Sequence, residues 1–237
     1  MTKLSVNINK IATLRNARGG NVPNLLTVAT DLQKFGAQGI TIHPRPDERH
    51  IKYQDARDLK NVVYTEFNIE GNPQHNFIDL VLECKPTQVT LVPDAIGAIT
   101  SSAGWDTIKN QSYLTEVIQE FQRNGIRTSI FVDPILEMIE GAKKIGTERI
   151  ELYTEEFAHQ YNLGNKNGIN PYIKAAFLAN ELNIGINAGH DLSLDNIKFF
   201  KENIPNLLEV SIGHALVTES LYLGFDNVVN MYLNKLK

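Results

Sequence analysis

Three histidines and two glutamates stand where short apolar segments of the chain end: His43, His190, His214, Glu70 and Glu151. Histidine titrates near neutral pH and suits proton transfer, and enclosure raises the pKa of a glutamate by desolvation. Together, such groups can run several proton transfers in sequence. A single buried His or Glu is about as often a hydrogen-bonded structural group, but five that converge are much harder to dismiss.

Glycines and cations near the same segment ends predict phosphate binding. Gly189 and Gly213 precede two of the histidines and let backbone N–H groups approach an anion. Arg45, Arg49 and His50 form a second cationic cluster that suits another phosphate. Glycine in such a turn is also typical of a plain turn, and Arg49 is equally compatible with a solvated loop. Two sites imply two phosphorylated substrates or one bisphosphate.

The elements that must position these residues repeat along the chain. Short apolar segments recur roughly every 20 to 40 residues, and a stretch with helical periodicity follows each one. The predicted strands are Leu4–Asn7, Gly39–His43, Val63–Glu70, Gln88–Val92, Thr128–Asp133, Arg149–Leu152, Ile184–Asn187 and Glu209–Ile212. The predicted helices are Leu25–Phe35, Tyr53–Lys60, His75–Cys84, Leu114–Asn124, Ile135–Ile145, Pro171–Leu182, Leu194–Glu202 and Phe225–Lys235.

Eight β-α units favour one closed barrel of the α/β class, a (β/α)8 TIM barrel that forms a single domain over residues 1–237. An open doubly wound sheet is the structural alternative. Within the second strand, Ile40 and Ile42 share one face and Thr41 and His43 the other. We expect the apolar faces to meet the helices and the polar faces to look into the barrel. The polar groups then fall at the carboxyl ends of the strands, where barrel enzymes place their chemistry.

Some residues outside this pattern receive other predictions. The loops Asp94–Gln111 and Thr154–Asn170 exceed the usual length of such connections and are candidate lids. His75 and His159 lie away from the strand ends, and we expect them at the surface. Cys84, the one cysteine, lies in an apolar helical stretch and is interpreted as a buried structural thiol.

The composition excludes several classes of function. The 237 residues carry a net charge of −4 from intermixed acids and bases, without the basic stripe that nucleic-acid binding needs. No segment approaches the roughly 20 apolar residues of a membrane span, and the polar start of the chain does not resemble a signal peptide. We therefore expect a cytoplasmic protein that binds small molecules, with neither nucleic acid nor membrane as partner.

Several runs of the chain resemble the pyridoxine 5'-phosphate synthase family. The similarity spans nearly the whole chain, and the longest run, from Ile11 to Gly19, is unusual enough to be specific. The matching runs are Asn7-Ile8, Ile11-Ala12-Thr13-Leu14-Arg15-Asn16-Ala17-Arg18-Gly19, Gly39-Ile40-Thr41-Ile42-His43, Arg49-His50-Ile51, Leu91-Val92-Pro93, Asn187-Ala188-Gly189-His190 and Ile212-Gly213-His214-Ala215.

The resemblance implies a (β/α)8 barrel with extra helices, assembled as a homo-octamer. It implies condensation of 1-deoxy-D-xylulose 5-phosphate with 3-amino-2-oxopropyl phosphate, giving pyridoxine 5'-phosphate, inorganic phosphate and water. No metal or organic cofactor is implied. By position, His43 resembles the general base, Glu70 a second proton acceptor, His190 the proton donor and Glu151 a carboxylate that stabilises charged intermediates. The implied deoxyxylulose phosphate contacts are Arg45, His50 and Ser101, and the implied amino ketone phosphate contacts are Asn7, Arg18, Gly213 and His214.

Four positions depart from the family pattern. Asn9 and Lys10 stand where the family usually has Asp and His, beside the sugar-phosphate site. Asp191 replaces the glycine that usually follows the seventh-strand histidine, which adds a negative charge near a phosphate unless the side chain turns away. Ser101 replaces a threonine and keeps the hydroxyl. We expect these changes to alter affinity and to leave the reaction the same.

Three other functions fit some of the same residues. A metal-dependent sugar-phosphate epimerase or aldolase could use His43, Glu70, Glu151 and His190 as ligands. A Schiff-base aldolase needs an inward lysine, for which Lys10 is the candidate at the strand ends. A non-catalytic sensor of phosphate esters is the third possibility, supported by the departures from the family pattern.

Overall fold

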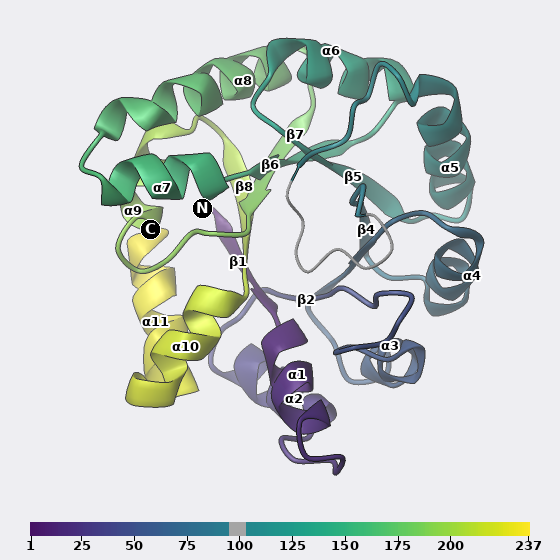
Figure 1. Ribbon diagram of the computed structural model, residues 1–237, viewed down its shortest axis with the longest axis vertical. Coiled ribbons are helices and arrows are strands. Elements are labelled where there is room, and N and C mark those ends of the chain that lie inside the picture. The colour runs from purple at the N-terminus through teal and green to yellow at the C-terminus, as the bar shows by residue number, and fades with distance from the viewer. Residues whose placement is uncertain (95–102) are drawn as a thin grey trace.

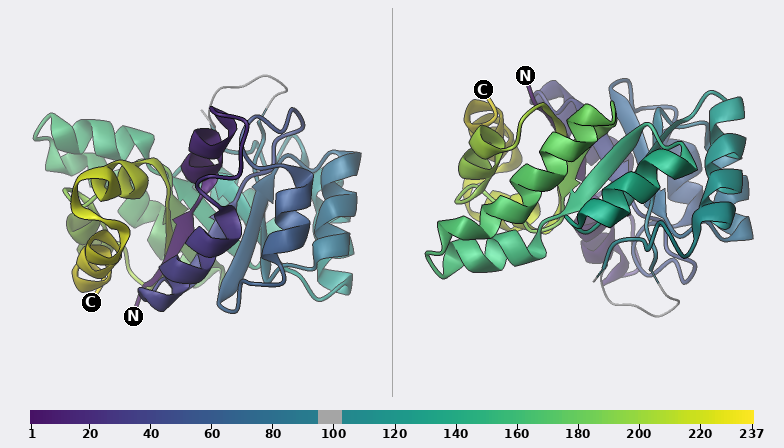
Figure 2. Two further views of the ribbon diagram at one scale, coloured as in Figure 1. Left: turned by 90° about the horizontal axis from the view of Figure 1, so that it is seen from below. Right: turned by 90° about the horizontal axis from the view of Figure 1, so that it is seen from above.

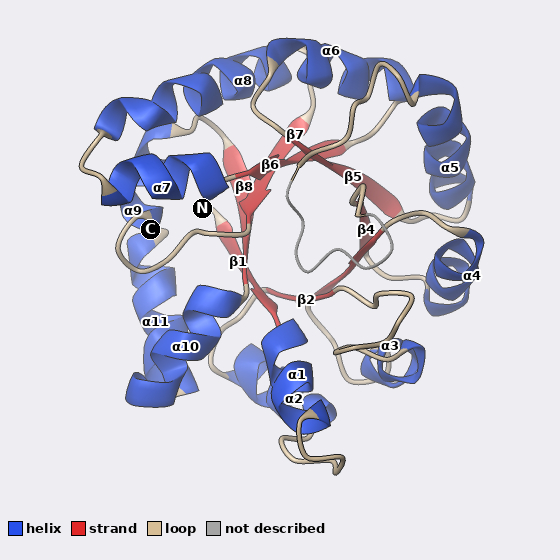
Figure 3. Cartoon of the chain, viewed as in Figure 1, coloured by secondary structure: helices blue, strands red, loops and turns tan. Residues whose placement is uncertain are grey.

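Parallel strands close a barrel in the computed structural model, which describes residues 1–94 and 103–237. Every strand pairs in parallel with the next, and the first also pairs with the last, so the sheet has no free edge. Figures 1 and 3 show the strands at the centre with helices around them. The strands are β1 (Lys3–Asn7), β2 (Gly39–Ile42), β3 (Glu66–Gly71), β4 (Gln88–Leu91), β5 (Arg127–Val132), β6 (Arg149–Tyr153), β7 (Gly185–Gly189) and β8 (Leu207–Ile212). The predicted TIM barrel is confirmed, and the open sheet is wrong.

All eight predicted helices are present within the described ranges, with shifts of a few residues at their ends. They are α2 (Leu25–Lys34), α3 (Tyr53–Leu59), α4 (His75–Cys84), α5 (Gln111–Arg123), α6 (Leu136–Ile145), α8 (Asn170–Glu181), α9 (Ile197–Asn203) and α11 (Phe225–Lys235). The same part of the chain contains further helices that the periodicity did not predict, namely α1 (Asn9–Asn16), α7 (Glu155–Asn162), α10 (His214–Leu223) and the short 3-10 helix η1 (Lys166–Ile169). These additions agree with the extra helices that the family resemblance implied.

The third strand begins later than predicted because a side chain replaces its first strand partners. The residues before Glu66 have strand-like composition, but the backbone N–H groups of Tyr64 and Thr65 donate to Gln33 Oε1, at 2.8 and 3.0 Å. Gln33 is buried on α2. Its amide therefore holds this segment as a connection between helix and barrel.

The predicted loop Thr154–Asn170 is wrong, because α7 and η1 occupy most of it. Its Asn and Gly content indicated a loop, whereas Glu155 and Glu156 suit the positive end of a helix dipole. Phe157 supplies the buried anchor and packs against the rings of Tyr172 and Phe200, with centroids 6.0 and 5.0 Å away. The segment is thus a packed helix where the sequence predicted a loop.

Polar side chains fill the middle of the barrel, where most TIM barrels have branched apolar residues. Ser5 and Thr41 share a hydrogen bond of 2.7 Å, and Thr90 donates to Asn68 at 3.0 Å. On the opposite face of β2, Ile40 and Ile42 are fully buried in the apolar core between the strands and the helices. The predicted alternation is confirmed in β2, and polar side chains fill this part of the interior.

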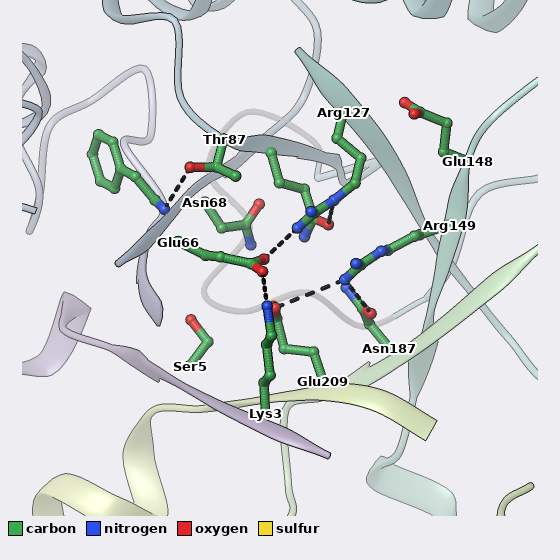
Figure 4. A network of polar contacts seen from close by, with 12 residues as sticks. Lys3, Ser5, Glu66, Asn68, Thr87, Arg127, Glu148, Arg149, Asn187 and Glu209 are labelled. Carbon is green, nitrogen blue, oxygen red and sulfur yellow. Dashed lines mark hydrogen bonds and ion pairs between the residues drawn. The ribbon is translucent and has the colours of Figure 1, made fainter. Parts of the chain in front are cut away.

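A network of charges closes the end of the barrel where the strands begin (Figure 4). Glu66 accepts from Lys3 and Arg127, while Arg149 lies 3.8 Å from Glu209. Burial raises the pKa of Glu209 to about 7, although Arg149 opposes the shift. The two cations hold the pKa of Glu66 at about 2, so this carboxylate stays ionised.

The remaining predictions concern positions away from the mouth of the barrel. His75 and His159 are exposed, as expected, and Cys84 is buried in the core. Both ends of the chain lie on the side of the barrel away from α1 (Figure 2). None of the helices in the described ranges is long and apolar enough to cross a membrane.

Candidate active site

One cavity of about 420 Å³ opens where the strands end, and it gathers most of the predicted site residues. Each of the eight strands contributes to it, with a residue at its end or shortly after it, which explains how residues distant in sequence meet. The predicted residues that line it are Asn7, Asn9, Lys10, His43, Arg45, His50, Glu70, Glu151, His190, Asp191, Gly213 and His214.

His43 lies at the centre of a polar cluster, directly after β2. Its Nδ1 is 3.8 Å from Glu70 Oε2 and its Nε2 is 3.5 Å from Asp94 Oδ2. The same Asp94 oxygen pairs with Arg45 Nη2 at 2.7 Å. Asn9 Oδ1 accepts the backbone N–H of His43 at 2.9 Å and so fixes the main chain. Burial, followed by the charge of Arg45, lowers the pKa of His43 well below its usual value. The ring is therefore neutral at physiological pH and able to accept a proton.

Glu70 and Glu151 face the same cavity with raised proton affinity. Burial raises the pKa of Glu70 well above its usual value, and the charge of Glu151 adds to this. Burial, with Glu209 as the second cause, raises the pKa of Glu151 to about 8. Gly189 gives Glu151 its room, because a Cβ there would lie 2.4 Å from Oε1. A raised pKa favours the protonated form, so these carboxyl groups are suited to donate a proton and to recover it.

His190 follows β7 and is oriented by two neighbours. Its Nδ1 lies 2.5 Å from Asp191 Oδ2, and the ring of Tyr153 meets it edge-on at 5.0 Å. The backbone of His190 has a φ of 95°, which turns the side chain out of the strand direction. The carboxylate of Asp191 is therefore turned against the imidazole, one of the two arrangements that the sequence left open.

The cationic side of the cavity is formed by Lys10, Arg45 and His50. His50 Nδ1 accepts the backbone N–H of Ile51 at 2.9 Å. Burial, then the charges of Arg45, Arg49 and Lys10, lower the pKa of His50 to about 4. A neutral ring whose Nδ1 accepts a hydrogen bond carries its proton on Nε2 and acts there as a donor.

A second anion-binding feature lies on the other side of β1, where α10 starts at His214 after β8. Gly213 is the residue before the helix, and a Cβ there would lie 3.2 Å from Asn7 Cβ. Backbone N–H groups in the first turn of a helix suit a phosphate. The cavity thus has anion-binding chemistry on two sides of its acid and base groups.

Two predicted residues are not brought into the cavity. Arg18 is exposed just beyond α1 and does not line it. Ser101 lies outside the described residues, as does the 95–102 part of the predicted lid Asp94–Gln111. Other lining residues were not in the predicted set: Val92, Phe131, Glu155 and Ser211. Asp94 was also left out, although it contacts His43 and Arg45. Its place directly after β4 was the available signal.

Comparison with known proteins decides the relationship. The family model for the pyridoxal phosphate biosynthesis protein PdxJ matches residues 4–237. The chain belongs to the PdxJ family. A pyridoxine 5'-phosphate synthase of Flavobacterium johnsoniae is 86% identical over 237 residues, covering 100% of both chains. Another from Christiangramia forsetii is 67% identical over the same full length. The family predicted from short motifs is therefore confirmed.

Solved structures outside the PdxJ family share only the fold. Phosphoribosyl anthranilate isomerase from Thermotoga maritima aligns with a TM-score of 0.62 at 13% identity, covering 100% of this chain and 98% of that one. Thiamine phosphate pyrophosphorylase from Pyrococcus furiosus aligns with a TM-score of 0.65 at 12% identity, covering 99% and 95%. These likenesses agree with the closed barrel.

Within residues 1–94 and 103–237, no group of three or more His, Cys, Asp or Glu side chains is arranged to hold a metal ion. Among the titratable side chains of the cavity, His43 lies near Glu70 and Asp94, and His190 contacts Asp191.

Proposed function

We propose that this protein condenses 1-deoxy-D-xylulose 5-phosphate with 3-amino-2-oxopropyl phosphate. The products are pyridoxine 5'-phosphate, inorganic phosphate and water. Imine formation, loss of phosphate, ring closure and successive dehydrations all require protons to be moved at positions held close together. The observation that carries the proposal is the set of His43, Glu70, Glu151 and His190 around one cavity, in a chain of the PdxJ family.

His43 acts in this proposal as the general base. Its lowered pKa keeps the ring neutral, so Nδ1 or Nε2 can take a proton from the substrate carbon or hydroxyl that reacts. Because burial disfavours the charged ring, the proton is passed on readily, and Asp94 Oδ2, 3.5 Å from Nε2, offsets part of the charge while the ring holds the proton. Glu70, 3.8 Å from Nδ1, is close enough to exchange protons with the same cluster.

Glu70, Glu151 and His190 supply the complementary steps. A carboxyl group with a raised pKa protonates a leaving hydroxyl and then recovers a proton, as dehydration requires. Glu70 was expected as an acceptor, and its raised pKa supports a role that begins with donation. His190, oriented by Asp191, serves as the donor on the opposite side, and Glu151 stabilises cationic intermediates once ionised.

Each of the two anion-binding sides of the cavity is proposed to bind the phosphate of one substrate. Lys10, Arg45 and His50 are proposed to bind the phosphate of deoxyxylulose phosphate, with charge-assisted hydrogen bonds from the two cations. Asn7 and the turn at Gly213-His214 are proposed to bind the amino ketone phosphate. In this proposal the reacting carbonyl and amine lie between the two phosphates, next to the acid and base groups.

The direct test is to incubate the purified protein with both substrates and to follow pyridoxine 5'-phosphate and released phosphate. We expect both products in equal amounts, and we expect full activity after exhaustive chelation. Tight binding of the substrates without product would support a phosphate-ester sensor and would contradict the proposal. Loss of activity on chelation, with recovery on adding a metal, would favour a metal-dependent enzyme.

We also propose that the protein works as a homo-octamer in the cytoplasm. Exposed apolar side chains at the end of α10 support self-association, since Leu221 and Tyr222 are 71% and 90% exposed. Arg18, exposed outside its own cavity, is a candidate to act in a neighbouring barrel. Light scattering after gel filtration should give eight times the mass of one chain, and Tyr222→Lys should reduce it. A wild-type monomer would contradict the proposal.

A further inference from the structure

The run from Ile11 to Gly19 contains more than the one residue that the proposed function uses. It forms most of α1 and the turn after it, and it includes Arg15 and Asn16 in the last turn of the helix. Arg15 is only 6% exposed, which is unusual for an arginine without a buried partner. Both side chains contact the connection between β2 and α3, which carries the cationic side of the cavity.

Arg15 joins two points of that connection. Its Nη1 and Nη2 bind the two carboxylate oxygens of Asp55, at 2.6 and 2.8 Å. Its Nη2 also donates to the backbone oxygen of His50 at 3.2 Å. Asp55 in turn accepts the backbone N–H of Lys52 at 2.7 Å, at the start of α3. One guanidinium thus ties His50 to the first turn of α3.

Asn16 completes the contact from the next position. Its Nδ2 donates to the backbone oxygens of His50 and Arg49, at 2.8 and 3.1 Å. Its Oδ1 accepts from Arg15 Nε at 3.0 Å, so the arginine fixes which way the amide points. The two side chains act as one unit, and the backbone oxygen of His50 receives a donor from each.

These backbone contacts also fix the position of the His50 ring. Ile51, the next residue, is fully buried, and its N–H donates to His50 Nδ1. Arg15 and Asn16, together called the clamp from here on, hold the peptide between His50 and Ile51. They therefore fix the N–H of Ile51, which is the donor that sets the tautomer of the His50 ring. Nε2 then carries the proton on a ring that lines the cavity. The ring lies edge-on to His43, with centroids 6.5 Å apart.

We propose that Arg15 and Asn16 are positioning residues, which hold His50 so that its Nε2–H meets the phosphate of deoxyxylulose phosphate. The inference rests on the proposed function, because it assigns that phosphate to the His50 side of the cavity. Neither residue lines the cavity, so both act through His50. Loss of either residue should therefore weaken the binding of deoxyxylulose phosphate much more than that of the amino ketone phosphate.

Asn16→Asp tests the clamp with little change of size. It replaces the amide donor with a carboxylate that faces two backbone oxygens. We expect the KM for deoxyxylulose phosphate to rise roughly tenfold, the loss expected for one or two hydrogen bonds. The KM for the amino ketone phosphate and kcat should change less than about twofold. Asn61→Asp is the matched control, because exposed Asn61 also donates to a backbone oxygen, that of Arg57.

Arg15→Lys is the second variant, because lysine keeps the charge but lacks the planar fork. We expect the same selective rise in KM. Thermal unfolding shows which variants fold, and if Arg15→Lys does not, Asn16→Asp decides alone. A folded Asn16→Asp enzyme with wild-type KM for deoxyxylulose phosphate would overturn the proposal. So would an equal rise in KM for both substrates.

The imidazole ¹⁵N resonances of His50 in the full-length protein give a readout independent of turnover. We expect the wild type to show the Nε2–H tautomer and a shift on adding inorganic phosphate. Asn16→Asp should lose the single tautomer and the response to phosphate. If the wild type forms no pyridoxine 5'-phosphate, the proposed function fails, while this readout still decides the clamp. An unchanged tautomer and phosphate response in folded Asn16→Asp would overturn the clamp.

Discussion

The contact between His190 and Asp191 shows how a neighbouring side chain can accommodate the charge that a substitution adds. The sequence placed an additional negative charge beside a phosphate site, whereas Asp191 Oδ2 lies 2.5 Å from His190 Nδ1. A carboxylate against Nδ1 keeps a proton on that nitrogen and fixes the ring. The negative charge of Asp191 therefore serves to orient His190, the proposed proton donor.

Asp191→Gly should therefore impair the chemical step. We expect kcat for product formation to fall roughly tenfold, less than the hundredfold or more that a well-placed general acid contributes, because the imidazole itself remains. Asp191→Asn, which retains an oxygen for the Nδ1 proton, should lose less. Steady-state kinetics with both substrates would check this. An Asp191→Gly enzyme with wild-type kcat would show that the contact does not orient the donor.

The functional residues could be predicted because strand alternation and strand ends are visible in sequence. His43, Glu70 and Glu151 follow from these two features alone. Their pKa shifts could not be predicted, since the shifts depend on burial and on distant partners. Glu209 is an example, because it lies far from Glu151 in the sequence and its charge still raises the pKa of Glu151.

At the level of elements, the end of β7 sets the room available to the acid groups. Gly189 is opposite Tyr153 in the β6 pairing, and it has no side chain that would meet Glu151. A Cβ there would lie 2.4 Å from Glu151 Oε1 and 3.1 Å from Ser211 O. Gly189, which the sequence suggested as an aid to phosphate binding, therefore also leaves room for the carboxyl group of Glu151.

Gly189→Ala should displace the carboxyl group of Glu151. We expect kcat to fall at least roughly tenfold, and the free energy of unfolding to fall by about 1–3 kcal/mol from overpacking. Gly20→Ala is the matched control, because nothing lies within 4 Å of a Cβ built there. Kinetics and urea unfolding of both variants would check the prediction. Equal kcat in the two variants would contradict it.

The helices outside the β-α repeat were the part of the fold that periodicity missed. Length does not explain this, because α1 and α7 have 8 residues and α10 has 10, whereas the predicted helices α3 and α9 have 7. The run that forms α1 was noticed for its resemblance to a family, and its role became visible only through contacts of Arg15 and Asn16. Such contacts join positions some 35 to 40 residues apart, which sequence periodicity does not report.

On the scale of the whole molecule, buried carboxyl groups tie stability to pH. Glu151 has a pKa of about 8 when folded, above the ordinary 4.5 of an unfolded glutamate. Between these values the folded chain holds a proton that the unfolded chain releases. The contribution of Glu151 to stability is therefore present below about pH 4.5 and is lost as the pH rises toward 8.

Glu151→Gln should remove this dependence, because an amide does not ionise. We expect the variant to gain stability relative to the wild type between pH 5.5 and pH 8.5, by at least about 1 kcal/mol in free energy of unfolding. Urea unfolding at the two pH values measures the gain, and Glu181→Gln on the exposed end of α8 is the control. A stability difference that stays constant with pH would refute the shift.

The account rests above all on His43 as the base in a ring-closing condensation. The most direct measurement compares the wild type, His43→Ala and the exposed control His75→Ala for pyridoxine 5'-phosphate formed from both substrates. We predict product from the wild type and the control, and a loss of roughly a hundredfold or more in the folded His43→Ala enzyme. Wild-type rates in His43→Ala would contradict the central claim.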